Sequence, residues 1–175
     1  MNEKRVYMSI ILSGDRTGRL LKYVPSSQRV YVMAKGLAFP NGVALSKENS
    51  FILVAESTTL KILKIALSGS NNIETFAEVP RSPDNIKRNA KGEFWVALNS
   101  GRGRINGLGK GREIETTVPW TTDPVAIKFD AEGNVVEVLD GGYGPQLNSV
   151  SEVEEHGGSL WIGSAVQPYV AVIKP

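Results

Sequence analysis

The stretch that decides the fold is LAFPNGVALSKENSFILVAES, Leu37 to Ser57, because a looser copy of it follows one element later. The copy is VPRSPDNIKRNAKGEFWVALNS, Val79 to Ser100. Both stretches run through a proline, a polar pair, an alternating strand, a turn, a second apolar strand and a small polar exit. Pro40 and Pro83 are separated by about forty residues, the length of a four-stranded propeller blade. The repeat therefore predicts blades.

Short alternating runs bounded by Gly, Pro, Asn and Ser extend outward from this repeat and favour strands throughout. The expected strands are Gly18–Val24, Arg29–Gly36, Gly42–Ser46, Phe51–Ser57, Leu60–Leu67, Ile73–Val79, Asn85–Asn89, Phe94–Asn99, Val125–Phe129, Asn134–Asp140, Ser151–Glu155, Ser159–Ser164 and Tyr169–Lys174. The segments KENS, AKGE, AEGN and HGGS between them are typical of tight hairpins. No segment has a helical period.

Grouping these strands by the repeat predicts one all-β domain over residues 1–175, a partial β-propeller. The expected groups are an outer strand pair (Gly18–Gly36), a complete blade (Asn41–Val79), a second complete blade (Asp84–Asp140) with an irregular insertion at 101–122, and three strands (Ser151–Lys174). Propellers usually close four to eight blades into a ring. Open ends present unpaired strand edges, so we expect self-association through the open blade edges.

Composition narrows the class of protein. The net charge is +2 and no run of Lys or Arg forms a basic patch, which argues against nucleic acid as a partner. The absence of cysteine excludes thiol catalysis, disulfides and Cys-based zinc sites. The apolar run VYMSIIL near the N-terminus is too short to span a membrane and lacks the cleavage pattern of a signal peptide.

Four segments resemble the strictosidine synthase-like proteins of plants, which are six-bladed β-propellers. The segments are GDRTGRLLKY (Gly14–Tyr23), GLAFPNGVALS (Gly36–Ser46), SPDNIKRNAKGEFWVALNS (Ser82–Ser100) and SEVEEHGGSLWIGS (Ser151–Ser164). The resemblance implies about three four-stranded antiparallel blades of a partial six-bladed propeller, with the N-terminal blades missing. Family members are typically vacuolar or secretory; if Met1 is the true start, the expected location is cytoplasmic.

The resemblance also assigns a position in the site. The catalytic glutamate of strictosidine synthase, which drives a Pictet–Spengler condensation, falls on Ser151. A serine hydroxyl does not exchange protons near neutral pH as a tuned carboxylate does. Glu152 is adjacent, but neighbours on a strand face opposite sides. We therefore expect no strictosidine synthase activity, leave the catalytic residue unassigned, and expect Ser151 and Trp120 to contact substrate.

The wider superfamily includes calcium-dependent lactonases and esterases of the paraoxonase type. Their calcium lies in the central channel, held at the starts of inner strands, and the resemblance places Asn41, Asp84 and Asn85 at such positions. Calcium takes six to eight oxygen ligands, including carboxylates and amides. The same residues also suit strand starts and turns, so both interpretations stay open. Half a ring supplies half the ligands, and we do not expect tight calcium binding by this chain alone.

Several other residues have simpler interpretations. His156 lies in a hairpin turn rather than a pocket, and Glu152, Glu154 and Glu155 are expected to form a solvated strand edge. Trp95 and Trp161 occupy matching second-strand positions and are expected to pack blades. The segment GRGRINGLGKG, within the insertion, fits neither the P-loop pattern nor a strand–loop–helix context.

Two functional hypotheses follow. In the first, full-length relatives are hydrolases that act on a small-molecule ester or lactone with calcium in the channel. In the second, the chain is a non-catalytic truncated propeller remnant or an interaction module. The residues that would separate the two hypotheses belong to the missing blades.

Overall fold

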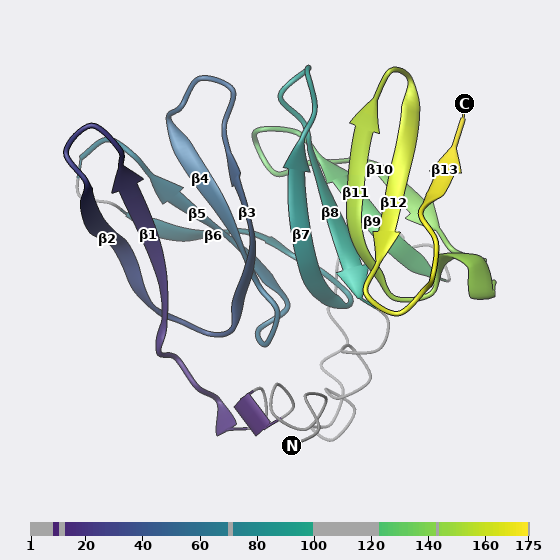
Figure 1. The fold of residues 1–175 in the computed structure, drawn as a ribbon, viewed down its shortest axis with the longest axis horizontal. Coiled ribbons are helices and arrows are strands. Elements are labelled where there is room, and N and C mark those ends of the chain that lie inside the picture. Colours follow the sequence, from purple (N-terminus) through teal and green to yellow (C-terminus); the bar gives the residue numbers. More distant parts are fainter. Residues whose placement is uncertain (1–8, 11–12, 70–71, 100–122, 143, 175) are drawn as a thin grey trace.

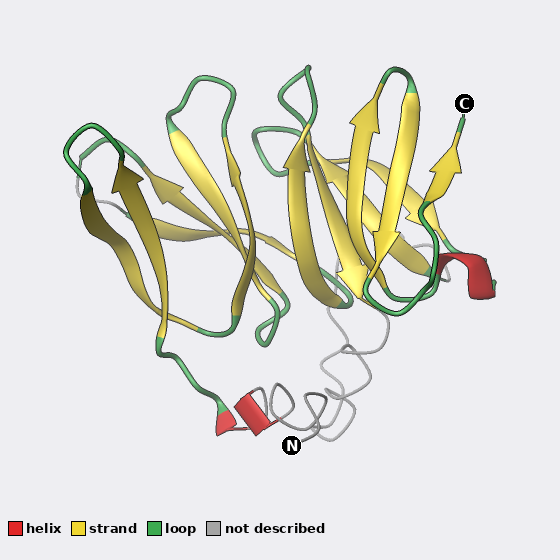
Figure 2. Cartoon of the chain, viewed as in Figure 1, coloured by secondary structure: helices red, strands yellow, loops and turns green. Residues whose placement is uncertain are grey.

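Short antiparallel strands make up most of this computed structural model, which describes residues 9–10, 13–69, 72–99, 123–142 and 144–174 (Figure 2). The strands are β1 (Gly18–Val24), β2 (Arg29–Leu37), β3 (Pro40–Leu45), β4 (Phe51–Glu56), β5 (Lys61–Ala66), β6 (Ile73–Glu78), β7 (Ser82–Arg88), β8 (Phe94–Asn99), β9 (Pro124–Phe129), β10 (Val135–Asp140), β11 (Val150–His156), β12 (Ser159–Ser164) and β13 (Ala171–Ile173). A short 3-10 helix, η2 (Pro145–Leu147), precedes β11. Every strand expected from the sequence is present.

The strands form four antiparallel sheets, which we call blades one to four in chain order (Figure 1). Blade one is β1–β2, blade two is β3–β4–β5–β6, blade three is β7–β8–β9–β10 and blade four is β11–β12–β13. This confirms the expected fold class, a partial six-bladed β-propeller. The predicted insertion at 101–122 lies outside the described residues.

The chain passes from the last strand of one blade to the first strand of the next. Strand β6 leads to β7, and β10 leads through η2 to β11. The first strands β3, β7 and β11 contact one another in succession, so they are the inner strands of the propeller. By the same order β2, which leads to β3, is an outermost strand. Blade one is therefore an outer pair, as the sequence predicted.

Strand ends differ from the prediction mainly at the inner strands. Strand β3 begins at Pro40 instead of Gly42, and β7 begins at Ser82 instead of Asn85. Proline lacks the N–H of a regular ladder and is tolerated at the start of a strand. Strand β13 covers Ala171–Ile173 only, half of its predicted length.

Apolar side chains fill the space between neighbouring blades. One core lies between blades two and three, with Leu53, Ile86 and Phe94 fully or nearly fully buried. A second lies between blades three and four around Trp95, and a third between blades one and two around Ile65. Burial of apolar area at these interfaces is the main stabilising term.

Four phenylalanines reinforce the interface between blades two and three. The rings of Phe51, Phe76, Phe94 and Phe129 lie with centroids 5.9 to 6.4 Å apart in tilted or edge-to-face arrangements. These geometries suit the quadrupoles of aromatic rings. Within the described part of the chain, no helix is long and apolar enough to cross a membrane.

Candidate functional site

Each inner strand carries a register shift near its start. The shift lies between Pro40 and Val43 in β3, between Pro83 and Ile86 in β7, and between Val150 and Glu152 in β11. In each case the inner strand advances one residue more than its partner strand does, which defines a β-bulge. Bulges are common beside active sites, where they redirect a side chain.

The registers also show which residues are equivalent from blade to blade. Pro40 pairs with Glu56, Pro83 with Leu98 and Val150 with Ser164, and each pair lies just before the bulge. The next residue in each inner strand is a polar one, namely Asn41, Asp84 or Ser151. Asn41 and Asp84 were predicted as metal ligands, and Ser151 was placed where the family has its catalytic glutamate. These three residues therefore occupy equivalent positions in adjacent blades.

The third predicted ligand lies one residue further on. Asn85 follows Asp84 in the bulge, and its equivalents in the neighbouring blades are Gly42 and Glu152. Neighbouring backbones come very close here. A Cβ added to Gly42 would lie 2.5 Å from the carbonyl oxygen of Asp84 and 2.6 Å from the Cα of Asn85. Glycine at position 42 lets β3 approach β7 at the site.

Ser57 links the site residues of blades two and three. Its hydroxyl donates to the carbonyl oxygen of Pro83 at 2.7 Å, and the side-chain amide of Asn41 donates to that hydroxyl at 3.4 Å. The Ser82 hydroxyl returns a hydrogen bond to the Ser57 carbonyl at 2.8 Å. Ser57 therefore holds the start of β7 beside Asn41.

Asn99, the equivalent of Ser57 in blade three, makes the same kind of link to blade four. Its amide donates to Oδ2 of Asp84 at 3.3 Å, and its Oδ1 accepts from the Ser149 hydroxyl at 2.9 Å. Asp84 is only 5% exposed, and buried polar groups are stable when they are hydrogen-bonded in this way. The sequence predicted small polar residues at the ends of these second strands. It did not predict these hydrogen bonds, because they join residues 15 and 50 positions apart.

Glu152 pairs with a cation of the neighbouring blade. Its Oε1 lies 3.4 Å from Nζ of Lys87, at a position next to Ser151 in the β11 bulge. Simple strand alternation, which placed Glu152 on the face opposite Ser151, does not hold across a bulge. The carboxylate is nevertheless engaged with Lys87, so Ser151 remains the residue at the equivalent of Asn41 and Asp84.

The prediction for Glu155, near the C-terminal end of β11, was wrong. This residue was expected at a solvated strand edge, but its Oε2 accepts from Nε1 of Trp95 at 3.1 Å and from the amide of Asn89 at 3.0 Å. Lys128 lies 3.8 Å from the same oxygen and 5.0 Å from the centre of the Trp95 ring. These partners are 60 or more positions away from Glu155 in sequence, or 27 in the case of Lys128, so no local pattern indicates them. Glu155 ties blade four to blade three.

These contacts shift the pKa of Glu155 and the pKa of Lys128 in opposite directions. The hydrogen bond from Asn89 holds the pKa of Glu155 below its usual value; partial burial opposes this, while Trp95 and Lys128 add to it. Burial would lower the pKa of Lys128, but the hydrogen bond and charge of Glu137 outweigh it and raise that pKa. Glu137 lies 2.6 Å from the Lys128 ammonium. Both groups stay charged near neutral pH.

The lowered pKa of Glu155 predicts acid sensitivity. A carboxylate with a lower pKa in the folded state stabilises that state above its unfolded pKa, and the gain disappears as pH falls through the folded pKa. Between about pH 5 and pH 3 the unfolding free energy of the wild type should therefore fall more steeply than that of Glu155→Gln. Urea titrations across this range measure the slopes. Glu154→Gln, at the exposed neighbour, should keep the wild-type slope, and an equal slope in Glu155→Gln would contradict the prediction.

The remaining predicted residues are His156, Trp120, Trp95 and Trp161. His156 ends β11 beside a hairpin turn and is exposed, in line with the prediction, and no group of three or more His, Cys, Asp or Glu suited to a metal occurs among the described residues. Trp120 lies outside the described residues. Trp95 and Trp161 do occupy matching positions, but Trp95 is 1% exposed and Trp161 is 46% exposed.

Comparisons with known proteins agree with the sequence resemblance. The sequence model of the strictosidine synthase family matches residues 2–70. Protein STRICTOSIDINE SYNTHASE-LIKE 10 of Arabidopsis thaliana is 42% identical over 97% of this chain and 50% of its own length. Strictosidine synthase of Catharanthus roseus is 34% identical over 94% of this chain and 44% of its own length. The chain thus spans about half the length of these relatives.

Solved structures share the fold at low sequence identity. A gluconolactonase from Xanthomonas campestris superposes with a TM-score of 0.58 at 17% identity, covering 82% of this chain and 40% of its own. The calcium-binding protein regucalcin from Agrobacterium tumefaciens also gives 0.58, at 12% identity, over 89% of this chain and 48% of its own. At these identities the likeness concerns the fold alone.

Proposed function

Because this chain matches the strictosidine synthase-like family along nearly its whole length, we propose that the complete protein hydrolyses an ester or lactone of a small molecule in the propeller channel. The observation that carries the proposal is the shared bulge position of Asn41, Asp84 and Ser151 in three adjacent inner strands. A gluconolactonase shares the fold, which makes the proposed reaction compatible with the architecture. Fold likeness alone does not assign chemistry.

Ser151 argues against the Pictet–Spengler condensation that strictosidine synthase catalyses. The family's catalytic glutamate supplies a carboxylate that takes up and releases a proton, and a serine hydroxyl does not do so near neutral pH. The nearest carboxylate along the strand, Glu152, is paired with Lys87. Ser151 is half-buried and remains suited to hydrogen bonding a substrate hydroxyl or carbonyl group.

The candidate site offers oxygen donors of the types that bind calcium. Asp84 offers a carboxylate and Asn85 an amide oxygen, while the Asn41 amide nitrogen donates to Ser57 and its oxygen is the atom left to act as a ligand. Calcium accepts such oxygens but needs six to eight of them, and three residues supply part of that set. When bound, the ion would polarise the scissile carbonyl group.

The chain's own residues do the positioning. Asn99 orients the Asp84 carboxylate, and Ser57 orients the Asn41 amide. Asn99 ends β8, the second strand of blade three, and Ser57 directly follows β4, the second strand of blade two. The rigid sheets therefore fix the positions of the Asp84 and Asn41 side chains. Trp120, beyond the described residues, remains a predicted substrate contact, and a vacuolar or secretory location remains a proposal from the family.

A non-catalytic role is the second candidate, and the open arc of blades favours it. The described residues give the two end blades two and three strands, so these residues form only part of a channel wall. In that case the site residues would serve only as turn and strand-start residues, and neither calcium nor a substrate would bind.

Binding of terbium, a luminescent calcium analogue, to the complete protein and its hydrolysis of a panel of lactones and aryl esters test the proposal. We expect calcium-dependent hydrolysis that EGTA or Asp84→Asn reduces about tenfold or more, since one carboxylate ligand is lost. Glu132→Gln, an exposed carboxylate at the β9–β10 hairpin, should change neither readout. No condensation of tryptamine with secologanin is expected. Terbium binding that is absent, or that is unaffected by Asp84→Asn, would favour the non-catalytic candidate.

A further inference from the structure

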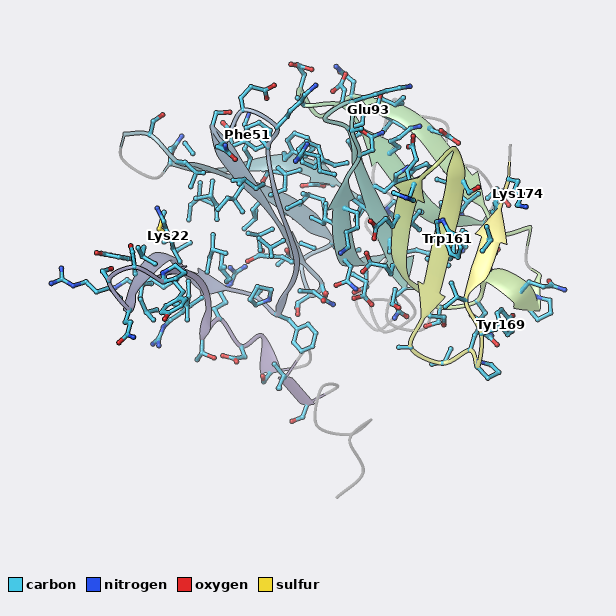
Figure 3. All side chains as sticks on the ribbon, turned by 45° about the horizontal axis from the view of Figure 1, so that its top comes forward. Lys22, Phe51, Glu93, Trp161, Tyr169 and Lys174 are labelled. Carbon is cyan, nitrogen blue, oxygen red and sulfur yellow. The ribbon has the colours of Figure 1, made fainter. Side chains whose placement is uncertain are left out.

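A short turn leads the chain into each inner strand, and one residue of it lies two positions before the residue at the candidate site. These entry residues are Phe39, Ser82 and Ser149. They lie where the inner strands begin (Figure 1), at the end of the blades opposite the β7–β8 hairpin that carries Glu93 (Figure 3). Phe39 and Ser149 have positive φ angles of 51° and 56°, whereas Ser82 lies within β7 and has no positive φ. Because left-handed backbone is strained for residues other than glycine, the turns into blades two and four are strained at this position.

The end of the second strand lies beside the entry turn of the same blade. By register, Glu56, Leu98 and Ser164 are equivalent there, because each pairs with the residue just before the bulge. The two polar residues belong to the blades whose entry residue is strained, and the apolar Leu98 belongs to blade three, where it is not. A polar side chain at this position therefore accompanies the strained turn.

Glu56 holds the entry turn of blade two. Its Oε1 accepts a hydrogen bond from the backbone N–H of Ala38 at 2.7 Å, and its Oε2 accepts one from the Thr59 hydroxyl at 2.7 Å. Glu56 is only 3% exposed, and a buried carboxylate is costly unless its oxygens are hydrogen-bonded. The backbone N–H of Ser57 donates to the carbonyl oxygen of Phe39 at 3.2 Å. The backbone is therefore held on both sides of the strained residue.

Ser164 holds the entry turn of blade four in a similar way. Its hydroxyl oxygen lies 2.8 Å from the carbonyl oxygen of Ser149 and 3.2 Å from that of Asn148. The same oxygen accepts hydrogen bonds from the backbone N–H groups of Val166 and Gln167 at 3.2 and 3.3 Å. One hydroxyl group thus joins the strained turn before β11 to the loop that follows β12.

We propose that Glu56 and Ser164 are positioning residues, which fix the strained entry turns and thereby the directions in which Asn41 and Ser151 leave their bulges. Asn41 lies two residues after Phe39, with a proline of fixed φ between them, so a rotation at Phe39 would move the Asn41 side chain. The proposal deepens the proposed function and rests on it for the role of Asn41 as a calcium ligand and of Ser151 as a substrate contact.

Residual dipolar couplings of backbone N–H groups test the proposal in the complete protein, since they report bond orientation and need no metal. Glu56→Leu introduces the residue that blade three has at this position and removes the acceptor of the Ala38 N–H. We expect it to change the coupling of Asn41 and to leave that of Ser151 unchanged. Glu56→Gln should keep the wild-type couplings, because its oxygen accepts from Ala38 and its amide donates to Thr59. A loss of stability alone would move neither coupling in the folded protein.

Ser164→Ala is the second variant and removes a single hydroxyl group. We expect it to change the coupling of Ser151 and to leave that of Asn41 unchanged, the reverse of Glu56→Leu. Glu78→Leu, the same exchange at an exposed glutamate that ends β6 of blade two, is the matched control and should change neither coupling. If Glu56→Leu does not fold, an unchanged Ser151 coupling in Ser164→Ala by itself overturns the proposal.

Terbium titration of the same variants separates this proposal from the proposed function. Glu56→Leu should raise the terbium dissociation constant about tenfold, the equivalent of one hydrogen bond. Glu56→Gln should keep the wild-type value, because the cation that it gives up, Arg16 at 4.0 Å, is exposed and therefore screened. Terbium binding with unchanged couplings in Glu56→Leu and Ser164→Ala would overturn the positioning role and leave the proposed function intact. Changed couplings in a wild type that binds no terbium would support the positioning role and overturn the calcium site.

Discussion

Trp95→Ala is expected to lower the unfolding free energy by about 3–5 kcal/mol, the cost of replacing a fully buried aromatic residue with alanine. Trp95 is 1% exposed and lies in the core between blades three and four with Val150, Val153 and Ile162. Its indole N–H also donates to Glu155 at 3.1 Å. The substitution leaves a cavity and removes one donor from a partly buried carboxylate. Urea unfolding followed by circular dichroism measures the loss.

Trp95→Phe separates the two contributions of this residue. Phenylalanine keeps most of the apolar contact but has no N–H for Glu155, so we expect a smaller loss of about 1–2 kcal/mol. A loss for Trp95→Ala no larger than that for Trp95→Phe would mean that the blade interface tolerates the cavity. The interface would then contribute less to stability than its burial implies.

Gly42→Ala should destabilise the fold by about 2–3 kcal/mol and disturb the site at the same time. The added Cβ would lie 2.5 Å from the Asp84 carbonyl oxygen and 2.5 Å from the backbone nitrogen of Ile86. Both atoms belong to the backbone of β7, so a side-chain rotation cannot relieve the contact. The two inner strands must separate, and Asp84 moves with β7. Thermal unfolding and terbium titration measure the two effects.

For the stability measurement Asn85→Ala is the matched control, because Asn85 occupies the position of Gly42 in the next blade. A Cβ is already present there, so we expect a loss below about 1 kcal/mol. If Gly42→Ala proved no more destabilising than Asn85→Ala, the close approach of β3 and β7 would not limit what residue 42 can be.

The blades could be predicted from sequence because their signals are local. Alternating apolar residues and turns such as KENS and AEGN specify a strand and its hairpin within a few positions. The repeat of Pro40 as Pro83 added the spacing of a blade. The resemblance to a known family then placed Asn41, Asp84 and Ser151 among the site residues, before any register was known.

Contacts between blades could not be predicted in this way. The hydrogen bonds of Asn99 to Asp84 and Ser149, and of Glu155 to Trp95, join strands that meet only after the sheets pack. A strand of charged residues such as SEVEEH has the same appearance whether it faces water or a neighbouring blade. The bulges that make Asn41, Asp84 and Ser151 equivalent likewise depend on pairing with the second strand.

Trp95 and Trp161 show the division most clearly. The sequence alone determined that both tryptophans occupy the same position in their blades, because the alternation and turns around them match. Only the tertiary structure decided that Trp95 is buried and Trp161 is 46% exposed. The physical reason is that burial depends on whether another blade packs against that face. Blade four covers Trp95, and no described residue of this chain covers Trp161 to the same degree.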